Sequence, residues 1–148
     1  MKAHGIAFFS SLFFLIVTTS FAQVKVFTSG QEGYKSFRIP AIVRAGNSDL
    51  LAIAEGRING ASDFGDINLV LKRSKDNGKT WSALQVLVDV GELQAGNPAP
   101  VLDQFDFLNP QGVLYVFYNT GNNHENEVRK GNGFREVWYI KSVDHGAT

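Results

Sequence analysis

The chain has 148 residues, and its 14 lysines and arginines balance its 14 aspartates and glutamates at a formal net charge of zero. This balance predicts no basic surface for nucleic acid. The sequence contains no cysteine, which excludes both disulfides and a thiol nucleophile.

Residues 1–22 are predicted to be a secretory signal peptide. Lys2 gives a short positive start, residues 6–17 are apolar apart from two serines, and Ser20-Phe21-Ala22 fits a small-x-small cleavage site. A membrane anchor is the alternative, but a span needs about 18 or more apolar residues. We therefore expect an exported protein that starts at Gln23 and has no transmembrane segment, in a periplasm, on the cell surface or outside the cell.

The rest of the chain is predicted to form short strands separated by turns. Residues 37–43, 50–54, 67–72 and 81–88 are rich in apolar and β-favouring side chains. Residues such as Asn and Gly, which tolerate positive φ, lie between them, as in Asp76-Asn77-Gly78. These four segments predict one four-stranded antiparallel unit.

The same pattern then starts again. Pro98-Ala99-Pro100-Val101 repeats Pro40-Ala41-Ile42-Val43, and residues 113–118 and 137–142 repeat the second and third segments. The polar residues 119–133 predict a long exposed loop inserted in the second copy. No long helix is expected after residue 22.

A Ser-x-Asp-x-Gly-x-Thr turn occurs in both copies. The first consists of Ser74, Asp76, Gly78 and Thr80 followed by Trp81, and the second consists of Ser142, Asp144, Gly146 and Thr148. The aspartate can accept hydrogen bonds from turn amides, and the tryptophan can cover the hairpin. A calcium loop is the alternative, but an EF-type loop needs more oxygen ligands and a terminal glutamate. We interpret both turns as structural and free of metal.

A repeated four-stranded unit predicts the blades of a β-propeller, with a β-sandwich as the alternative. Two blades cannot close a ring, so the sheet should keep an open edge. The second turn stops before its tryptophan, which favours a piece of a larger domain.

These features resemble a known family. The repeated turn resembles the Asp box, and Phe37-Arg38-Ile39-Pro40, Ala54-Glu55-Gly56-Arg57 with Asp63, and Asn97-Pro98 follow in family order. The chain thus resembles the N-terminal part of secreted bacterial-type sialidases (exo-α-sialidases, neuraminidases). The resemblance implies an all-β fold in which residues 23–148 form the first two blades of an incomplete six-bladed propeller.

Arg38 and Asp63 are the candidates for binding and catalysis. Arg38 lies on an apolar segment, so we expect it to be buried with an anionic partner, which an internal salt bridge would also provide. Its planar fork matches a carboxylate, and the resemblance implies that it is the first of three arginines on the sialic-acid carboxylate. Spacing alone does not choose between Asp63 and Asp66; the resemblance implies that Asp63 is the acid/base catalyst, for which we expect a raised pKa.

Two further residues are candidates for substrate binding. Arg57 either pairs with Glu55 or Asp63 on the surface or, as the resemblance implies, contacts sugar hydroxyls around carbon 4. Asn97 either shares that contact or is a turn residue before Pro98. The histidines have no metal-ligand spacing, and neither a metal nor a cofactor is expected.

The resemblance implies a retaining exo-α-sialidase that removes terminal α-linked sialic acid from glycoproteins, glycolipids and oligosaccharides. Sialidases use a tyrosine nucleophile, which the family places on a later blade together with its glutamate. We therefore expect the 148 residues alone to be inactive. The alternative is a non-catalytic Asp-box propeller that binds glycans or proteins.

Overall fold

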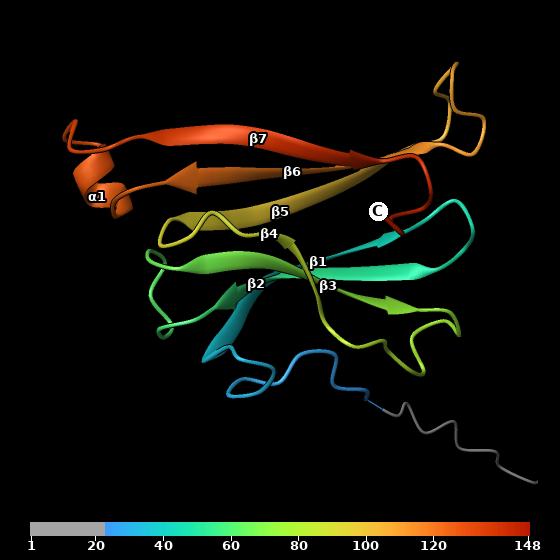
Figure 1. The fold of residues 1–148 in the computed structure, drawn as a ribbon, viewed down its shortest axis with the longest axis horizontal. Helices are drawn as coiled ribbons and strands as arrows, with labels where there is room; N and C mark the ends of the chain where they lie inside the picture. The colour runs from blue at the N-terminus through green and yellow to red at the C-terminus, as the bar shows by residue number, and fades with distance from the viewer. Residues whose placement is uncertain (1–22) are drawn as a thin grey trace, which may run out of the picture.

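The computed structural model describes residues 23–148, so the predicted signal peptide lies outside the described residues. The described chain is all-β except for one short helix (Figure 1). Its elements in chain order are β1 (Ser36–Arg44), β2 (Leu50–Arg57), β3 (Ile67–Ser74), β4 (Gln85–Val88), β5 (Gln94–Asp103), β6 (Val113–Gly121), α1 (Glu125–Val128) and β7 (Arg135–Ser142).

The strands form two antiparallel units that share one open sheet. Strands β1 to β4 pair in sequence in the first unit, and β5 to β7 do so in the second. A single parallel pair, Ile67 with Gln94, joins the two units, so the strand order is β1-β2-β3-β5-β6-β7 with β4 beside β3. The backbone thus confirms the repeat that the sequence predicts.

Two predicted boundaries are wrong. The fourth strand begins at Gln85 and not at residue 81. Ser82 bonds to Arg73 through its backbone N–H (2.8 Å) and, in place of its carbonyl, through its hydroxyl (3.0 Å), which interrupts regular strand pairing in that segment. The predicted loop 119–133 is also shorter, because β6 continues to Gly121, opposite Arg135, and α1 forms within the remaining segment.

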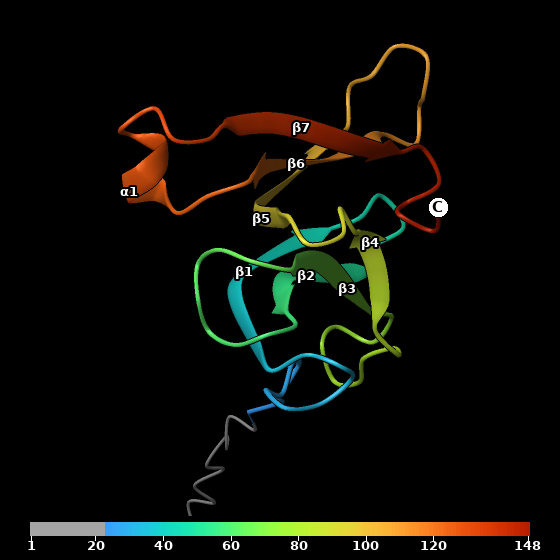
Figure 2. The same ribbon diagram turned by 60° about the vertical axis from the view of Figure 1, so that its left-hand side comes forward.

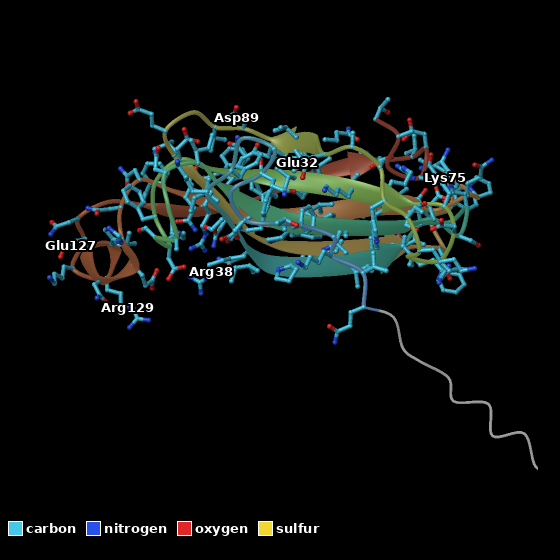
Figure 3. All side chains as sticks on the ribbon, turned by 90° about the horizontal axis from the view of Figure 1, so that it is seen from below. Glu32, Arg38, Lys75, Asp89, Glu127 and Arg129 are labelled. Atoms are coloured by element: carbon cyan, nitrogen blue, oxygen red, sulfur yellow. The ribbon has the colours of Figure 1, made fainter. Side chains whose placement is uncertain are left out.

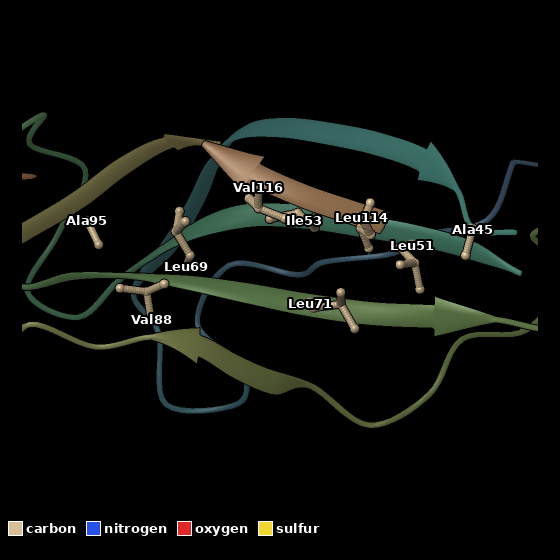
Figure 4. Packing of buried hydrophobic residues seen from close by; sticks show 9 residues of the cluster. All are labelled: Ala45, Leu51, Ile53, Leu69, Leu71, Val88, Ala95, Leu114 and Val116. Carbon is tan, nitrogen blue, oxygen red and sulfur yellow. The ribbon is translucent and has the colours of Figure 1, made fainter. Parts of the chain in front are cut away.

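The main core lies between the two units. Leu51 and Ile53 of β2 and Leu69 of β3 are completely buried, and they share a cluster with Leu114 and Val116 of β6 (Figure 4). Burying each such side chain contributes about 1.5–3 kcal/mol. This cluster fixes the two units relative to one another.

A second cluster covers the opposite face of the first unit. Tyr34, from the segment before β1, packs with Ala54 and Val70, and Phe27 and Phe37 lie against them. Strand β2 is therefore buried on both faces, as the apolar run of residues 50–54 predicts.

The loops gather at two ends of the sheet. Residues 58–66 and the segment with α1 lie at one end, and residues 45–49, 104–112 and the C-terminus lie at the other (Figures 1 and 2). The candidate site is at the first end.

Candidate functional site

Two matching irregularities shape the first strand of each unit at this end. Strand β1 has a register shift between Arg38 and Ala41, and β5 has one between Gly96 and Ala99. Each shift contains a residue with left-handed backbone directly before a proline, Ile39 with φ 51° and Asn97 with φ 55°. β-Bulges of this kind redirect neighbouring side chains.

A cavity of about 500 Å³ lies beside these irregularities and brings the four predicted site residues together. Arg38, Arg57, Asp63 and Asn97 all line it. Further lining residues include Glu55, Gln94, Asn119, His124, Glu125 and Arg135. Both units contribute to the cavity, so the site depends on the way they pack.

Arg38 and Asp63 form an ion pair at the mouth of this cavity. Arg38 Nη1 lies 2.6 Å from Asp63 Oδ1, and the two side chains are 46% and 74% exposed. The expectation that Arg38 is buried is therefore wrong, because β1 is the edge strand of the sheet and residues 38–40 are exposed. The expected anionic partner is present, and the guanidinium stays accessible to a ligand.

Arg57 is buried, contrary to the expectation of a surface pair. Only 2% of Arg57 and 1% of Glu55 are exposed, and Arg57 Nε and Nη2 both donate to Glu55 Oε2. Arg57 Nη1 lies 2.9 Å from Asp63 Oδ1 and also donates to the backbone oxygens of Ala61 and Ser62. Arg57 thus reaches from the interior to the loop that carries Asp63.

The pKa of Asp63 is lowered in this structure, whereas the sequence predicts a raised pKa. The hydrogen bond from Arg57 is the largest cause, and the charges of Arg38 and Arg57 add to it. The loop holds this carboxylate between two guanidinium groups and not in a dry apolar setting, so it is ionised in the ligand-free chain.

Asp66 has the opposite electrostatics. Burial raises its pKa, and the charges of Asp89 and Glu92 raise it further. Asp66 lines a separate cavity of about 160 Å³ with residues of its own loop. Of the two aspartates that the spacing leaves open, Asp63 is the one placed beside Arg38.

Asn97 enters the cavity from the second unit. Its backbone N–H donates to Glu55 Oε1 over 2.9 Å, so the left-handed bulge before Pro98 connects it to the first unit. Asn97 is therefore a bulge residue within β5 and not a turn residue, and it lines the cavity.

Sequence reasoning missed the polar group on the floor of the second unit. The buried Gln94 accepts a hydrogen bond from Arg135 Nη1 (2.8 Å), and Arg135 Nη2 lies 3.4 Å from Glu125 Oε2. Two sequence positions could have indicated these residues: Gln94 comes just before the repeated bulge, and Arg135 stands at the start of a strand. These residues add a third guanidinium and two polar groups to the cavity.

Two loops meet beside Asp63. The rings of Phe64 and His124 lie 5.1 Å apart between centroids, which joins loop 58–66 to the segment before α1. The described residues, 23–148, contain no cluster of three or more acidic, histidine or cysteine side chains suited to a metal ion. None of Tyr34, Tyr115, Tyr118 and Tyr139 lines the cavity.

The two Ser-x-Asp-x-Gly-x-Thr turns have the same hydrogen bonds. Asp76 accepts from the hydroxyl of Thr80 over 2.6 Å, and Asp144 accepts from that of Thr148 over 2.6 Å. In each turn the serine hydroxyl also accepts the glycine N–H. Lys75 of the first turn lies at the opposite end of the sheet from Arg38 (Figure 3), and no residue of either turn lines the candidate cavity.

These contacts strongly favour the ionised aspartate. The hydroxyl and backbone N–H of Thr80, followed by Ser74, lower the pKa of Asp76 to about 2. Ser142 and Thr148 lower the pKa of Asp144 in the same way. The hydrogen bonds of the ionised aspartates therefore stabilise the two turns.

Across residues 23–148, no helix is both long enough and apolar enough to cross a membrane.

Comparisons with known proteins identify relatives of part of the chain. An exo-α-sialidase of Arthroderma benhamiae is 47% identical over 118 residues, which are 76% of this chain and 27% of the relative. An exo-α-sialidase of Aspergillus fumigatus is 45% identical over 93 residues, 56% of this chain and 23% of the relative. The chain thus spans about a quarter of the length of these curated relatives. No protein-family model matches it.

The fold is similar to that of solved sialidases. The Hadza microbial sialidase Hz136 superposes with a TM-score of 0.65 and 21% sequence identity, over 81% of this chain and 26% of that one. This likeness concerns the fold, and the higher identity of the fungal relatives connects the sequence to the same family.

Proposed function

Since the chain is a sialidase-family member by sequence and fold, we propose that it supplies the first two blades of the propeller and half of the active site of an exo-α-sialidase. Each antiparallel unit corresponds to one blade, with β1 and β5 innermost. The complete enzyme would remove terminal α-linked sialic acid from glycoconjugates with retention. Later blades would supply two more arginines, a tyrosine and its glutamate.

The observation that carries this proposal is the Arg38–Asp63 pair at the cavity mouth. An accessible guanidinium fork is suited to bind the carboxylate of a sialic acid through two parallel hydrogen bonds. The adjacent carboxyl group is suited to exchange a proton with the glycosidic oxygen. An anion-binding group and an acid side by side are what a sialoside requires.

Binding and proton transfer are coupled in this arrangement. A substrate carboxylate competes with Asp63 for Arg38, which removes one of the two cations that lower the Asp63 pKa. Protonated Asp63 then donates its proton to the leaving oxygen as the glycosidic bond breaks and the tyrosine oxygen bonds to the anomeric carbon, while the glutamate takes the phenolic proton, which it returns when the tyrosine leaves. Asp63 next takes a proton from the water that replaces the tyrosine.

The remaining site residues bind the sugar in this proposal. Arg57 and Asn97 line the part of the cavity for hydroxyl groups around carbon 4, where the side-chain amide of Asn97 makes the contact because the nitrogens of Arg57 are bonded to Glu55 and the loop. The serine–aspartate turns are Asp boxes that only hold the blades. Residues 1–22 direct export, so the enzyme meets sialylated glycans outside the cytoplasm. The chain by itself lacks the nucleophile and should not turn over a sialoside.

The test compares leaving groups in the complete product of the gene. Asp63→Ala should lower the turnover of sialyllactose about 100-fold or more, but lower that of an activated aryl sialoside much less, because a good leaving group needs no proton. Asp66→Ala is the matched control and should leave this ratio unchanged. An equal loss on both substrates would remove Asp63 from the acid role. Sialoside binding without any turnover by the wild type would favour a non-catalytic propeller.

A further inference from the structure

We propose that Glu55 is a positioning residue of this site. Its buried carboxylate holds Arg57 and the backbone of Asn97, and through Arg57 it fixes the loop that carries Asp63. The inference rests on the proposed function, because it assigns Glu55 a task in the reaction of Asp63. It is carried by contacts that the sequence motifs do not explain.

The first contact holds the guanidinium. Arg57 Nε lies 3.0 Å from Glu55 Oε2, and Nη2 donates to the same oxygen. Both side chains are almost completely buried, at 3% and 2% exposure for Arg57 and Glu55. A guanidinium that makes two hydrogen bonds to one buried oxygen cannot rotate freely.

The second contact passes this orientation to the loop. Arg57 Nη1 donates to the backbone oxygens of Ala61 (2.7 Å) and Ser62 (2.8 Å) and lies 2.9 Å from Asp63 Oδ1. Three consecutive residues of the loop therefore contact one nitrogen. The side chain of Asp63 is 74% exposed, so few packing contacts hold it, and Arg57 is the main constraint from within.

The third contact reaches the other unit. Glu55 Oε1 accepts the backbone N–H of Asn97 over 2.9 Å. Gly96, which precedes Asn97, leaves room for this carboxylate, because a Cβ at position 96 would lie 2.7 Å from Glu55 Oε1. One carboxylate thus uses one oxygen for each half of the cavity and sets their relative position.

Stability alone does not explain this buried pair. Two buried charges cost desolvation energy that their attraction often fails to exceed, and apolar residues of similar size are frequently as stable. A pair of this kind is better explained by the geometry that it imposes. Here that geometry places Asp63 beside Arg38 and turns Asn97 towards the same cavity.

The test is Glu55→Gln in the complete product of the gene, with Glu32→Gln as the matched control. Glutamine preserves the size of Glu55 but removes its charge and presents an amide donor to one of its two donor neighbours. Glu32 pairs with Lys72 over 2.8 Å away from the cavity. We expect Glu55→Gln to lower kcat for sialyllactose at least tenfold more than kcat for an activated aryl sialoside, with KM changed less than kcat.

A second measurement does not depend on activity. Hydrogen exchange of the loop amides of Ile58 and Phe64, which donate to Asp66 O (3.1 Å) and Ser62 Oγ (3.3 Å), should become at least tenfold faster in Glu55→Gln, while the amides of β2 and β3 keep their wild-type rates. Arg57→Lys should reproduce both the change in kcat and the faster loop exchange, because lysine keeps the charge but loses the planar fork. This variant replaces Glu55→Gln in the test if Glu55→Gln fails to fold.

The outcomes separate this inference from the proposed function. Unchanged exchange in the loop, or a loss of kcat that is equal for both leaving groups, would overturn the positioning role. If the wild-type protein turns over no sialoside but loop exchange still depends on Glu55, the proposed reaction is wrong and the positioning of the loop stands.

Discussion

Ile39 and Asn97 hold the same backbone conformation at equivalent places in the two units. Their φ angles are 51° and 55°, each residue precedes a proline, and each lies within the register shift of the first strand of its unit. Asparagine tolerates this left-handed region, whereas a β-branched residue is strained there. The second unit thus indicates that asparagine would relieve the backbone strain at position 39.

Ile39→Asn should therefore stabilise the chain. The left-handed conformation costs an ordinary residue roughly 1–2 kcal/mol, and the burial lost from Ile39, which is 38% exposed, offsets part of this gain. We expect the free energy of unfolding to rise by about 1 kcal/mol in urea denaturation. Ile42→Asn is the control: Ile42 is 61% exposed and has no positive φ, so it should show no gain. Equal effects of the two substitutions would argue against strain at position 39.

Gly96→Ala should destabilise the junction between the units. An added Cβ would lie 2.7 Å from both Glu55 Oε1 and Gln94 Nε2, and both residues are buried. Overpacking of this kind costs about 1–3 kcal/mol. Gly60→Ala is the control, because nothing lies within 4 Å of its Cβ position and its φ is not positive. Thermal unfolding of the two variants measures the difference, and a Gly96→Ala protein as stable as Gly60→Ala would contradict this packing.

The residues of the site could be predicted from the sequence, but their environment could not. Arg38, Arg57, Asp63 and Asn97 all reach one cavity as the motifs predict. The exposure of Arg38 and the burial of Arg57 depend on where each strand lies in the sheet: β1 is at the edge, whereas β2, which ends at Arg57, lies between β1 and β3. The lowered pKa of Asp63 follows from that placement, since both arginines then lie beside it.

The parts of the site that were missed come from tertiary contacts. Glu55 lies within the motif Ala54-Glu55-Gly56-Arg57, but its role depends on Asn97, 42 residues later in the chain. Gln94 and Arg135 meet only because β5 and β7 flank β6 at the same end. Local patterns predicted the strands and both polar turns, whereas the network across the units required the packed sheet.

The first polar turn should make stability depend on acid pH. The folded-state pKa of Asp76 is lowered from 3.8 to about 2 by Thr80 and Ser74. The stabilising contribution is therefore fully present above pH 3.8 and is lost as the pH falls towards 2. Urea midpoints measured from pH 5 to 2 should fall less steeply for Asp76→Asn than for the wild type. Glu136→Gln, which removes an exposed carboxylate of β7, is the control and should keep the wild-type slope. If Glu136→Gln flattened the pH dependence of the urea midpoint as much as Asp76→Asn does, Asp76 would not be the source of the acid dependence.

Replacement of Arg38 should affect ligand binding more than folding. Lysine keeps the positive charge but loses the planar fork that can make two parallel hydrogen bonds to a carboxylate. We expect Arg38→Lys to raise KM for sialyllactose about tenfold or more in the complete product of the gene, consistent with the loss of one charge-assisted hydrogen bond of about 1.5–3 kcal/mol. Because the side chain is 46% exposed, the unfolding midpoint should hardly change. Arg44→Lys is the matched control, since Arg44 donates to Ser48 and Asn77 at the far end of the sheet. A similar KM in both variants would show that Arg38 does not bind the substrate carboxylate.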